Sequence, residues 1–158
     1  DGLISIRINS TANNLEKIDL DGIKEAKSSF GLNISPEPGN LRALQIGSLE
    51  KVGGNLDIIL KTSRIDAVLL NKLEQVNGNL KLKGQTRWQA IELHTVGYNF
   101  RLINTTVRTA NSFYKLENAE KIYLKNNSAL KDCDFPSIPD DSEIIVRSAL
   151  NHPECSAP

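Results

Sequence analysis

The chain is poor in the residue types that usually carry catalysis or metal binding. Its 158 residues include two histidines, two cysteines and one tryptophan, and methionine is absent. The sequence also lacks a glycine-rich phosphate loop, a His-Glu-x-x-His segment and a Cys-x-x-Cys pair. Because these patterns mark the common nucleotide and zinc sites, we expect neither a cofactor nor a metal ion.

Net charge is absent as well. Lys and Arg together number 19, and so do Asp and Glu. A chain without net charge exerts no broad attraction on polyanions, so we expect no nucleic acid partner and no binding to an anionic membrane. No apolar run approaches the ~18 residues of a membrane helix, which predicts no membrane span in this chain. A lipid anchor beyond Pro158 stays open.

Four Asn-x-Ser/Thr sequons, the acceptor sequences for N-glycosylation, occur along the chain. Each would be a surface acceptor if the chain passed through the secretory pathway. The chain begins at Asp1 without an initiator methionine or an apolar leader, which is typical of a mature or trimmed product. A fragment of a longer protein is the open alternative. The sequons lie at Asn9, Asn33, Asn104 and Asn126.

The two cysteines, Cys133 and Cys155, lie on either side of the last strand-like run, residues 143–147. In an oxidising compartment they would form a disulfide, and the chain-entropy model values such a loop closure at ~3 kcal/mol. We favour the disulfide because the last turn of a repeat array has no neighbour to cover it. Two free thiols are the alternative.

A repeated phrase dominates the rest of the sequence. It runs Leu-Glu-Lys-Val-Gly-Gly-Asn-Leu-Asp-Ile at 49–58 and recurs at 73–82 and 93–102, with a shortened copy at 116–124. The anchor residues Leu56, Leu80, Phe100 and Ile122 are 24, 20 and 22 residues apart. A period in this range indicates a solenoid, in which each repeat forms one turn, or rung, and stacks on the next.

Alternating apolar residues separated by Gly, Asn, Asp and Ser clusters predict short strands. We therefore expect one all-β domain over 1–158, a right-handed parallel β-solenoid of two sheets and about seven rungs of 20–24 residues, with 126–158 as a C-terminal cap. Residues 19–29 could form a short helix. The first sheet is expected at 3–8, 31–34, 55–60, 79–82, 99–103, 121–124 and 143–147, and the second at 15–20, 41–46, 65–70, 88–93, 107–111 and near 130.

The repeat also predicts particular roles at its corner. Asn55, Asn79 and Asn99 precede the inward Leu or Phe of each strand, and we expect their side chains to hydrogen-bond to one another along the axis. Gly53 and Gly78 are expected to adopt positive φ at the same corner. The inward column is predicted to contain Leu32 followed by Leu56, Leu80, Phe100 and Ile122.

Candidate functional residues are few. Asp132, Asp134, Asp140 and Asp141 could in principle serve a polysaccharide-degrading β-helix enzyme, but they lie in a proline-punctuated loop, and we expect no catalytic residues. Outward positions on the strands are the better candidates, either as a solvated charged face or as a strip that holds an extended glycan or a protein. This candidate binding face contains Asp57, Lys81, Trp88, Tyr98, Arg101 and Tyr123, the three aromatic residues being candidates for stacking.

The repeat Leu-x-x-Val-x-Gly-x-Leu-x-Ile resembles the receptor L-domain type of leucine-rich solenoid. Within that group the chain is most similar to fungal GPI-anchored cell-wall organisation proteins, with a cap match at 126–133, Phe135 and Cys155. The resemblance covers roughly residues 20–155 and implies an extracellular, wall-associated glycoprotein without catalytic activity. Cell-wall polysaccharide or a surface protein would then be its partner. The alternative is a recognition module, either a receptor L-domain or a secreted effector, that binds a protein or a glycan.

Overall fold

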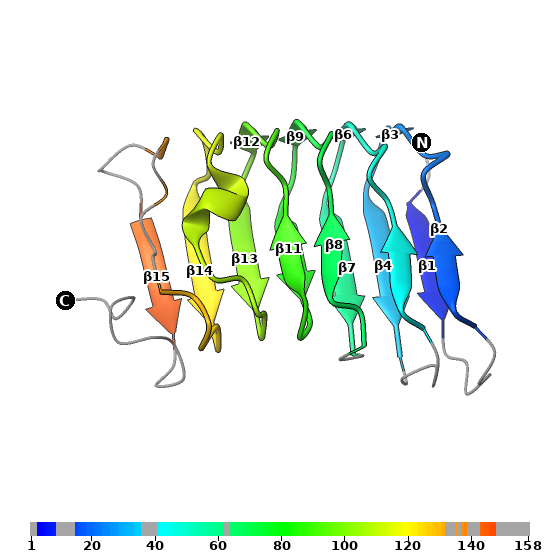
Figure 1. The fold of residues 1–158 in the computed structure, drawn as a ribbon. Helices are drawn as coiled ribbons and strands as arrows, with labels where there is room; N and C mark the ends of the chain where they lie inside the picture. The colour runs from blue at the N-terminus through cyan, green and yellow to red at the C-terminus, as the bar shows by residue number, and fades with distance from the viewer. Residues whose placement is uncertain are drawn as a thin grey trace.

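The computed structural model describes residues 3–8, 15–35, 41–61, 64–131, 135, 137–138 and 143–147. Within these residues the regular structure consists almost entirely of short β-strands, which pair in parallel with strands of neighbouring rungs. The chain thereby winds into an elongated β-solenoid, with β1 at one end and β15 at the other (Figure 1). The predicted all-β parallel solenoid is confirmed.

The broadest side of the solenoid is one seven-stranded parallel sheet, which we call the large sheet. Each of its strands pairs with the strand one rung later, so equivalent side chains form columns along the axis. The strands in spatial order are β1 (Ile4–Ile8), β4 (Phe30–Ile34), β7 (Leu56–Leu60), β10 (Leu80–Lys83), β13 (Asn99–Ile103), β14 (Lys121–Lys125) and β15 (Glu143–Arg147).

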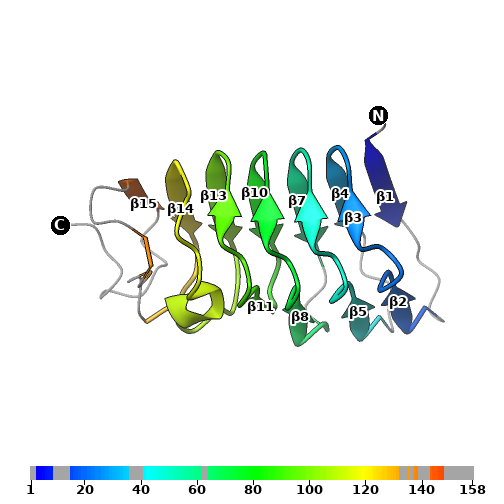
Figure 2. The same cartoon turned by 90° about the horizontal axis from the view of Figure 1, so that it is seen from above.

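Two further sides complete the rung, so the solenoid is three-sided and the prediction of two sheets was wrong (Figure 2). Strands on the third side are only two residues long, and two residues cannot display an alternating pattern. The second side contains β2 (Lys17–Asp19), β5 (Ala43–Gln45), β8 (Ala67–Leu69) and β11 (Arg87–Gln89). The third side contains β3 (Glu25–Ala26), β6 (Lys51–Val52), β9 (Gln75–Val76) and β12 (Thr95–Val96).

Four successive rungs carry a strand on all three sides. In the next rung, β13 is followed by the 3-10 helix η1 (Ala110–Phe113), which takes the place of the strand predicted at 107–111. An isolated parallel bridge between Thr95 and Asn118 stands on the third side of that rung. No strand is described near Leu130. The prediction of about seven rungs therefore corresponds to the strands of the large sheet alone.

The core is built from the inward columns of the large sheet and the apolar residues of the other two sides. β7 buries its first, third and fifth residues, as alternation predicts. From Leu56 onward the predicted inward column is present, but β4 joins it with Phe30 instead of Leu32. The preceding residues Ser29 and Asn55 are 26 apart, so this rung is longer than the repeat suggested. A shift of two residues keeps both side chains inward.

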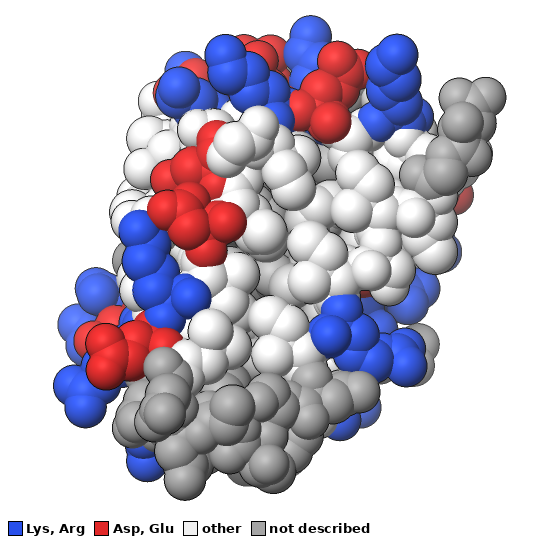
Figure 3. All heavy atoms as spheres, turned by 90° about the vertical axis from the view of Figure 1, so that its right-hand side faces the viewer, with Lys and Arg blue, Asp and Glu red and all other residues white. Residues whose placement is uncertain are grey.

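The N-terminal end of the solenoid exposes apolar side chains. Leu3 is 67% and Ile4 37% exposed, whereas Phe30, the register partner of Ile4 in the next rung, is 1% exposed. The difference arises because β4 has a neighbour on each side, while β1 is the edge strand. Figure 3 looks at this end and shows uncharged atoms over its centre with charged side chains around the rim.

The helix considered at residues 19–29 is not formed. β2 ends at Asp19, a turn follows in which the Ile23 amide donates to the Leu20 carbonyl at 3.0 Å, and β3 begins at Glu25. The same turn recurs in a later rung, where the Leu73 amide donates to the Leu70 carbonyl, also at 3.0 Å. Pairing with the next rung therefore decides the conformation, in preference to local helix propensity.

The predicted asparagine ladder is present at the corner that leads into the large sheet. The Nδ2 group of Asn79 donates to Asn55 Oδ1 at 2.9 Å, and that of Asn99 donates to Asn79 Oδ1 at 2.8 Å. The backbone amides of Asn79 and Asn99 donate to the same two oxygens, at 2.8 and 3.3 Å. The side chains of Asn55 and Asn79 thus each satisfy two donors of the following rung.

An ion pair continues this corner beyond the ladder. The register places Lys121 next to Asn99 and Glu143 next to Lys121. Lys121 Nζ lies 2.8 Å from Glu143 Oε2. This hydrogen bond, together with the charge of the carboxylate, raises the pKa of the Lys121 ammonium. The corner therefore changes from amide contacts to a charged contact at β14.

Replacing Asn79 by alanine should break three side-chain hydrogen bonds of the ladder together. At roughly 0.5–1.5 kcal/mol net for each bond, we expect the free energy of unfolding to fall by about 2–3 kcal/mol. Denaturant titration measures the change. The control is Asn118→Ala, since the exposed Asn118 side chain makes no hydrogen bond within the described residues, and its effect should stay below about 0.5 kcal/mol. Equal losses in the two variants would contradict a stabilising ladder.

The glycines of the repeat do not adopt positive φ, which corrects the prediction for Gly53 and Gly78. A Cβ on Gly53 would lie 2.1 Å from the Lys27 carbonyl oxygen, and one on Gly78 would lie 2.7 Å from the Gly54 carbonyl carbon. Glycine is required here because neighbouring rungs approach closely. Positive φ occurs instead after the strands of the large sheet, at Gly84 (144°), Asn104 (53°) and Asn126 (57°).

Candidate binding face

The outward side of the large sheet brings together four of the six predicted face residues. Asp57, Lys81, Arg101 and Tyr123 occupy one register position in β7, β10, β13 and β14. Arg101 is exposed, and the other three are partly exposed, while the residues before and after each of them are buried. No ion pair joins Asp57 to Lys81 in the part of the chain that the structure describes. The four side chains form one continuous outward column.

A second outward column lies two residues further along the same strands. The sequence reasoning did not single it out, although the period of two that placed the first column also places this one. It combines cationic side chains with isoleucines and one asparagine. Its members from β1 to β14 are Arg7, Asn33, Ile59, Lys83, Ile103 and Lys125.

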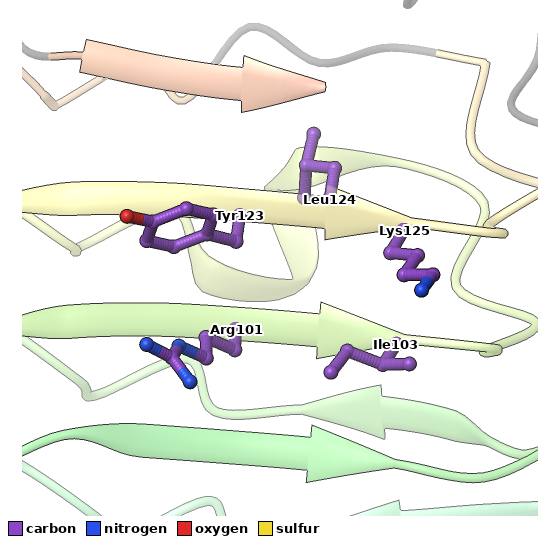
Figure 4. A pocket seen from close by; sticks show the side chains of 5 residues that line it. All are labelled: Arg101, Ile103, Tyr123, Leu124 and Lys125. Carbon is purple, nitrogen blue, oxygen red and sulfur yellow. The ribbon is translucent and has the colours of Figure 1, made fainter. Parts of the chain in front are cut away.

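A shallow groove of about 380 Å³ lies where the two columns cross β13 and β14. Figure 4 shows Arg101 beside Tyr123 and Ile103 beside Lys125, each pair on adjacent strands. The guanidinium carbon of Arg101 lies 5.2 Å from the centroid of the Tyr123 ring, in cation–π contact. Leu124 completes the lining. The groove thus offers two cations, an aromatic ring and the apolar side chain of Ile103.

Trp88 does not belong to this face, and its predicted outward orientation was wrong. The side chain is fully buried, and its register partner Val68 in β8 is buried as well. The prediction counted alternation back from Leu93, but β11 ends at Gln89 and a turn at residues 91–92 intervenes. The alternation of inward and outward residues holds only within one strand, so it cannot be continued across a turn.

Tyr98 stands apart from both columns. It precedes Asn99, the first residue of β13, and lies at the corner between the third side and the large sheet. Its side chain is 56% exposed, and its backbone accepts a hydrogen bond from the Glu120 amide at 2.8 Å. The three aromatic residues proposed for stacking therefore do not form one patch.

Three of the four sequons lie on or beside the large sheet. Asn33 is the fourth of the five residues of β4, and its Oδ1 atom is buried without a hydrogen-bond partner. Asn104 and Asn126 occupy the positive-φ corner, where Nδ2 of Asn126 donates to Asn104 Oδ1 at 2.9 Å. Asn9 lies outside the described residues, as do Cys133, Cys155 and the carboxylates Asp132, Asp134, Asp140 and Asp141.

The described residues contain no group of three or more His, Cys, Asp or Glu side chains able to hold a metal ion. Among them there is also no helix with the length and apolarity needed to cross a bilayer.

Comparison of the chain with protein-family models, with curated proteins and with solved structures finds no match.

Proposed function

We propose that the protein is a non-catalytic, secreted glycoprotein of the cell surface or cell wall, built on a receptor L-domain type of scaffold. The observation that carries this proposal is the contrast between two columns of the same rungs. Asparagine repeats at one corner position, where it links the rungs, while the outward position in the same strands changes from Asp57 to Lys81 to Arg101 to Tyr123. A fixed scaffold with a variable outer surface suits adhesion or wall organisation.

The shape of the outer surface supports a contact role over a catalytic one. Most glycoside hydrolases need two carboxyl groups held across a cleft. The two outward columns carry one carboxylate, Asp57, and the groove beside Tyr123 is shallow. The burial of Trp88 also removes one of the three aromatic residues on which a protein-recognition patch would depend. A flat face that holds an extended polymer fits these observations best.

Expression in a eukaryotic secretory host should yield a glycoprotein whose apparent mass falls on treatment with an N-glycosidase. We expect the sequons at Asn104 and Asn126 to contribute more than that at Asn33, because both lie at a corner and Asn33 lies within the sheet. Gel mobility of single-sequon variants measures each contribution.

The matched variant for Asn104 is Thr106→Ala, which removes the sequon and keeps the asparagine side chain that accepts from Asn126. It should abolish the same mobility step as Asn104→Gln. If the secreted chain shows no shift at any of the four sequons, the proposal of a secreted glycoprotein is wrong.

A further inference from the structure

The zero net charge of the chain conceals a segregation of charge between its sides. The two outward columns of the large sheet contain five cationic residues and a single carboxylate, Asp57. The expectation that no polyanion is attracted treats charge as evenly spread, and the structure shows that it is not. The cations are Arg7, Lys81, Lys83, Arg101 and Lys125. The third side and its turns carry both signs, with Glu25, Glu50, Glu74, Glu117 and Glu120 beside Lys24, Lys27 and Lys51.

The cations of the two columns form no ion pair within the described residues. The ion pairs of that part of the chain lie outside the two columns, for example Lys17 with Asp19 at 2.9 Å and Lys115 with Glu92 at 2.6 Å. Arg101 contacts the ring of Tyr123, which leaves its positive charge uncompensated. The outer face thus displays more positive charge than its single carboxylate, Asp57, can neutralise.

Two of these cations repel each other in register. Lys81 lies opposite Arg101 on one neighbouring strand and opposite Asp57, the single carboxylate of the face, on the other, with parallel strands ~4.8 Å apart. Lys83 lies on the same face two residues further along β10. Like charges directly opposite one another on a sheet destabilise it. An anionic ligand lying across β10 and β13 would convert this repulsion into attraction.

We propose that the outer face of the large sheet binds an extended anionic polysaccharide. The polymer runs along the solenoid axis across β10, β13 and β14, with its anionic groups against Lys81, Arg101 and Lys125. A sugar ring occupies the groove beside Tyr123 and Ile103. This proposal adds a ligand class to the proposed function. It rests on the proposed function only in assuming that the large sheet is the contact surface.

A polysaccharide fits this face better than a nucleic acid. Proteins that bind single strands stack successive bases on several aromatic side chains, and the two columns offer one ring, that of Tyr123. Duplex recognition needs a helix or ribbon that enters a groove, which a flat face does not provide. Cations that recur from rung to rung suit a polymer that carries a charge on each sugar.

The test measures binding of the full chain, produced without glycans in bacteria, to immobilised polygalacturonate, to heparin and to neutral dextran. We expect binding to at least one anionic polymer, none to dextran, and a loss of affinity as salt rises because these charges are exposed. Polygalacturonate carries carboxylates alone and heparin carries both carboxylates and sulfates, so binding to polygalacturonate would show that carboxylates suffice and binding to heparin alone would show that sulfates are needed.

A face variant, K81Q/K83Q/R101Q, should weaken binding by about tenfold or more. The matched control, K24Q/K27Q/K72Q, removes the same three charges from exposed residues outside the large sheet and should change affinity less than about twofold. Thermal unfolding checks that both variants fold. The face variant should stay within about 1 kcal/mol of the parent, because it loses the like-charge contact of Lys81 with Arg101 together with the Asp57 neighbour of Lys81 and the contact of Arg101 with Tyr123.

Three outcomes would overturn the proposal: no binding to either anionic polymer, equal losses in the two triple variants, or tighter binding to single-stranded DNA or to anionic lipid vesicles. Because the bacterially produced chain carries no glycans, the binding result does not depend on whether the sequons are glycosylated. A chain that is glycosylated on secretion but binds no anionic polymer would keep the proposed function and reject this ligand.

Discussion

Gly97→Ala should destabilise the solenoid by at least about 3 kcal/mol, at the upper end of what overpacking usually costs. A Cβ at this position would lie 2.0 Å from the Asn77 carbonyl oxygen and 2.7 Å from its carbonyl carbon. Both atoms belong to the backbone of the preceding rung, so no side-chain rotation can relieve the overlap. Denaturant unfolding followed by circular dichroism measures the loss.

Gly22→Ala is the matched control, because no atom lies within 4 Å of the position that its Cβ would take and its φ is not positive. We expect it to leave stability unchanged or to raise it by about 0.4–1 kcal/mol through the unfolded state. If the two alanine variants unfolded at the same denaturant concentration, close approach of the rungs would not explain the glycines of the repeat.

Trp88→Ala should lower the free energy of unfolding by about 3–5 kcal/mol, because it empties a fully buried aromatic site. Trp88→Phe should cost less than the alanine change. The indole Nε1 atom is buried and has no hydrogen-bond partner, so the phenylalanine variant also removes an unsatisfied donor. The lone tryptophan provides the measurement in the parent, since its fluorescence shifts to longer wavelength when unfolding exposes it.

Tyr98→Ala serves as the comparison for an exposed aromatic residue. With 56% of Tyr98 exposed, its loss should change stability by no more than about 0.5 kcal/mol. Native emission at the wavelength of a solvent-exposed indole, or similar stabilities for Trp88→Ala and Tyr98→Ala, would place Trp88 on the surface after all.

The parts of the fold that carry the repeated phrase could be predicted from the sequence. The phrase at 49–58, 73–82 and 93–102 fixes the register from β7 to β13, and with it the inward column and the asparagine ladder. Where the phrase is absent, at β4, the predicted register fails. The 26-residue spacing between Ser29 and Asn55 moved the predicted alignment by two residues.

The other wrong predictions concern features that a local sequence pattern does not reveal. A two-residue strand such as β6 is defined by its partners in adjacent rungs, and these appear only when the chain is folded. The outward orientation assigned to Trp88 failed because a turn interrupts the alternation. Charge segregation was missed because the count of 19 against 19 sums over all sides of the solenoid.

The corner that links the rungs responds to salt and pH at the C-terminal end of the solenoid and not along the asparagine ladder. From Asn55 to Asn99 the contacts are between uncharged amides, which neither salt nor titration disturbs. From β14 onward the contact is the Lys121–Glu143 pair, whose partners are exposed and screened by salt. Because the pKa of Lys121 is raised, its contribution is present at neutral pH and is lost as the pH rises through that value. Fraying under alkaline or saline conditions would therefore start at β15 and stop at the amide ladder.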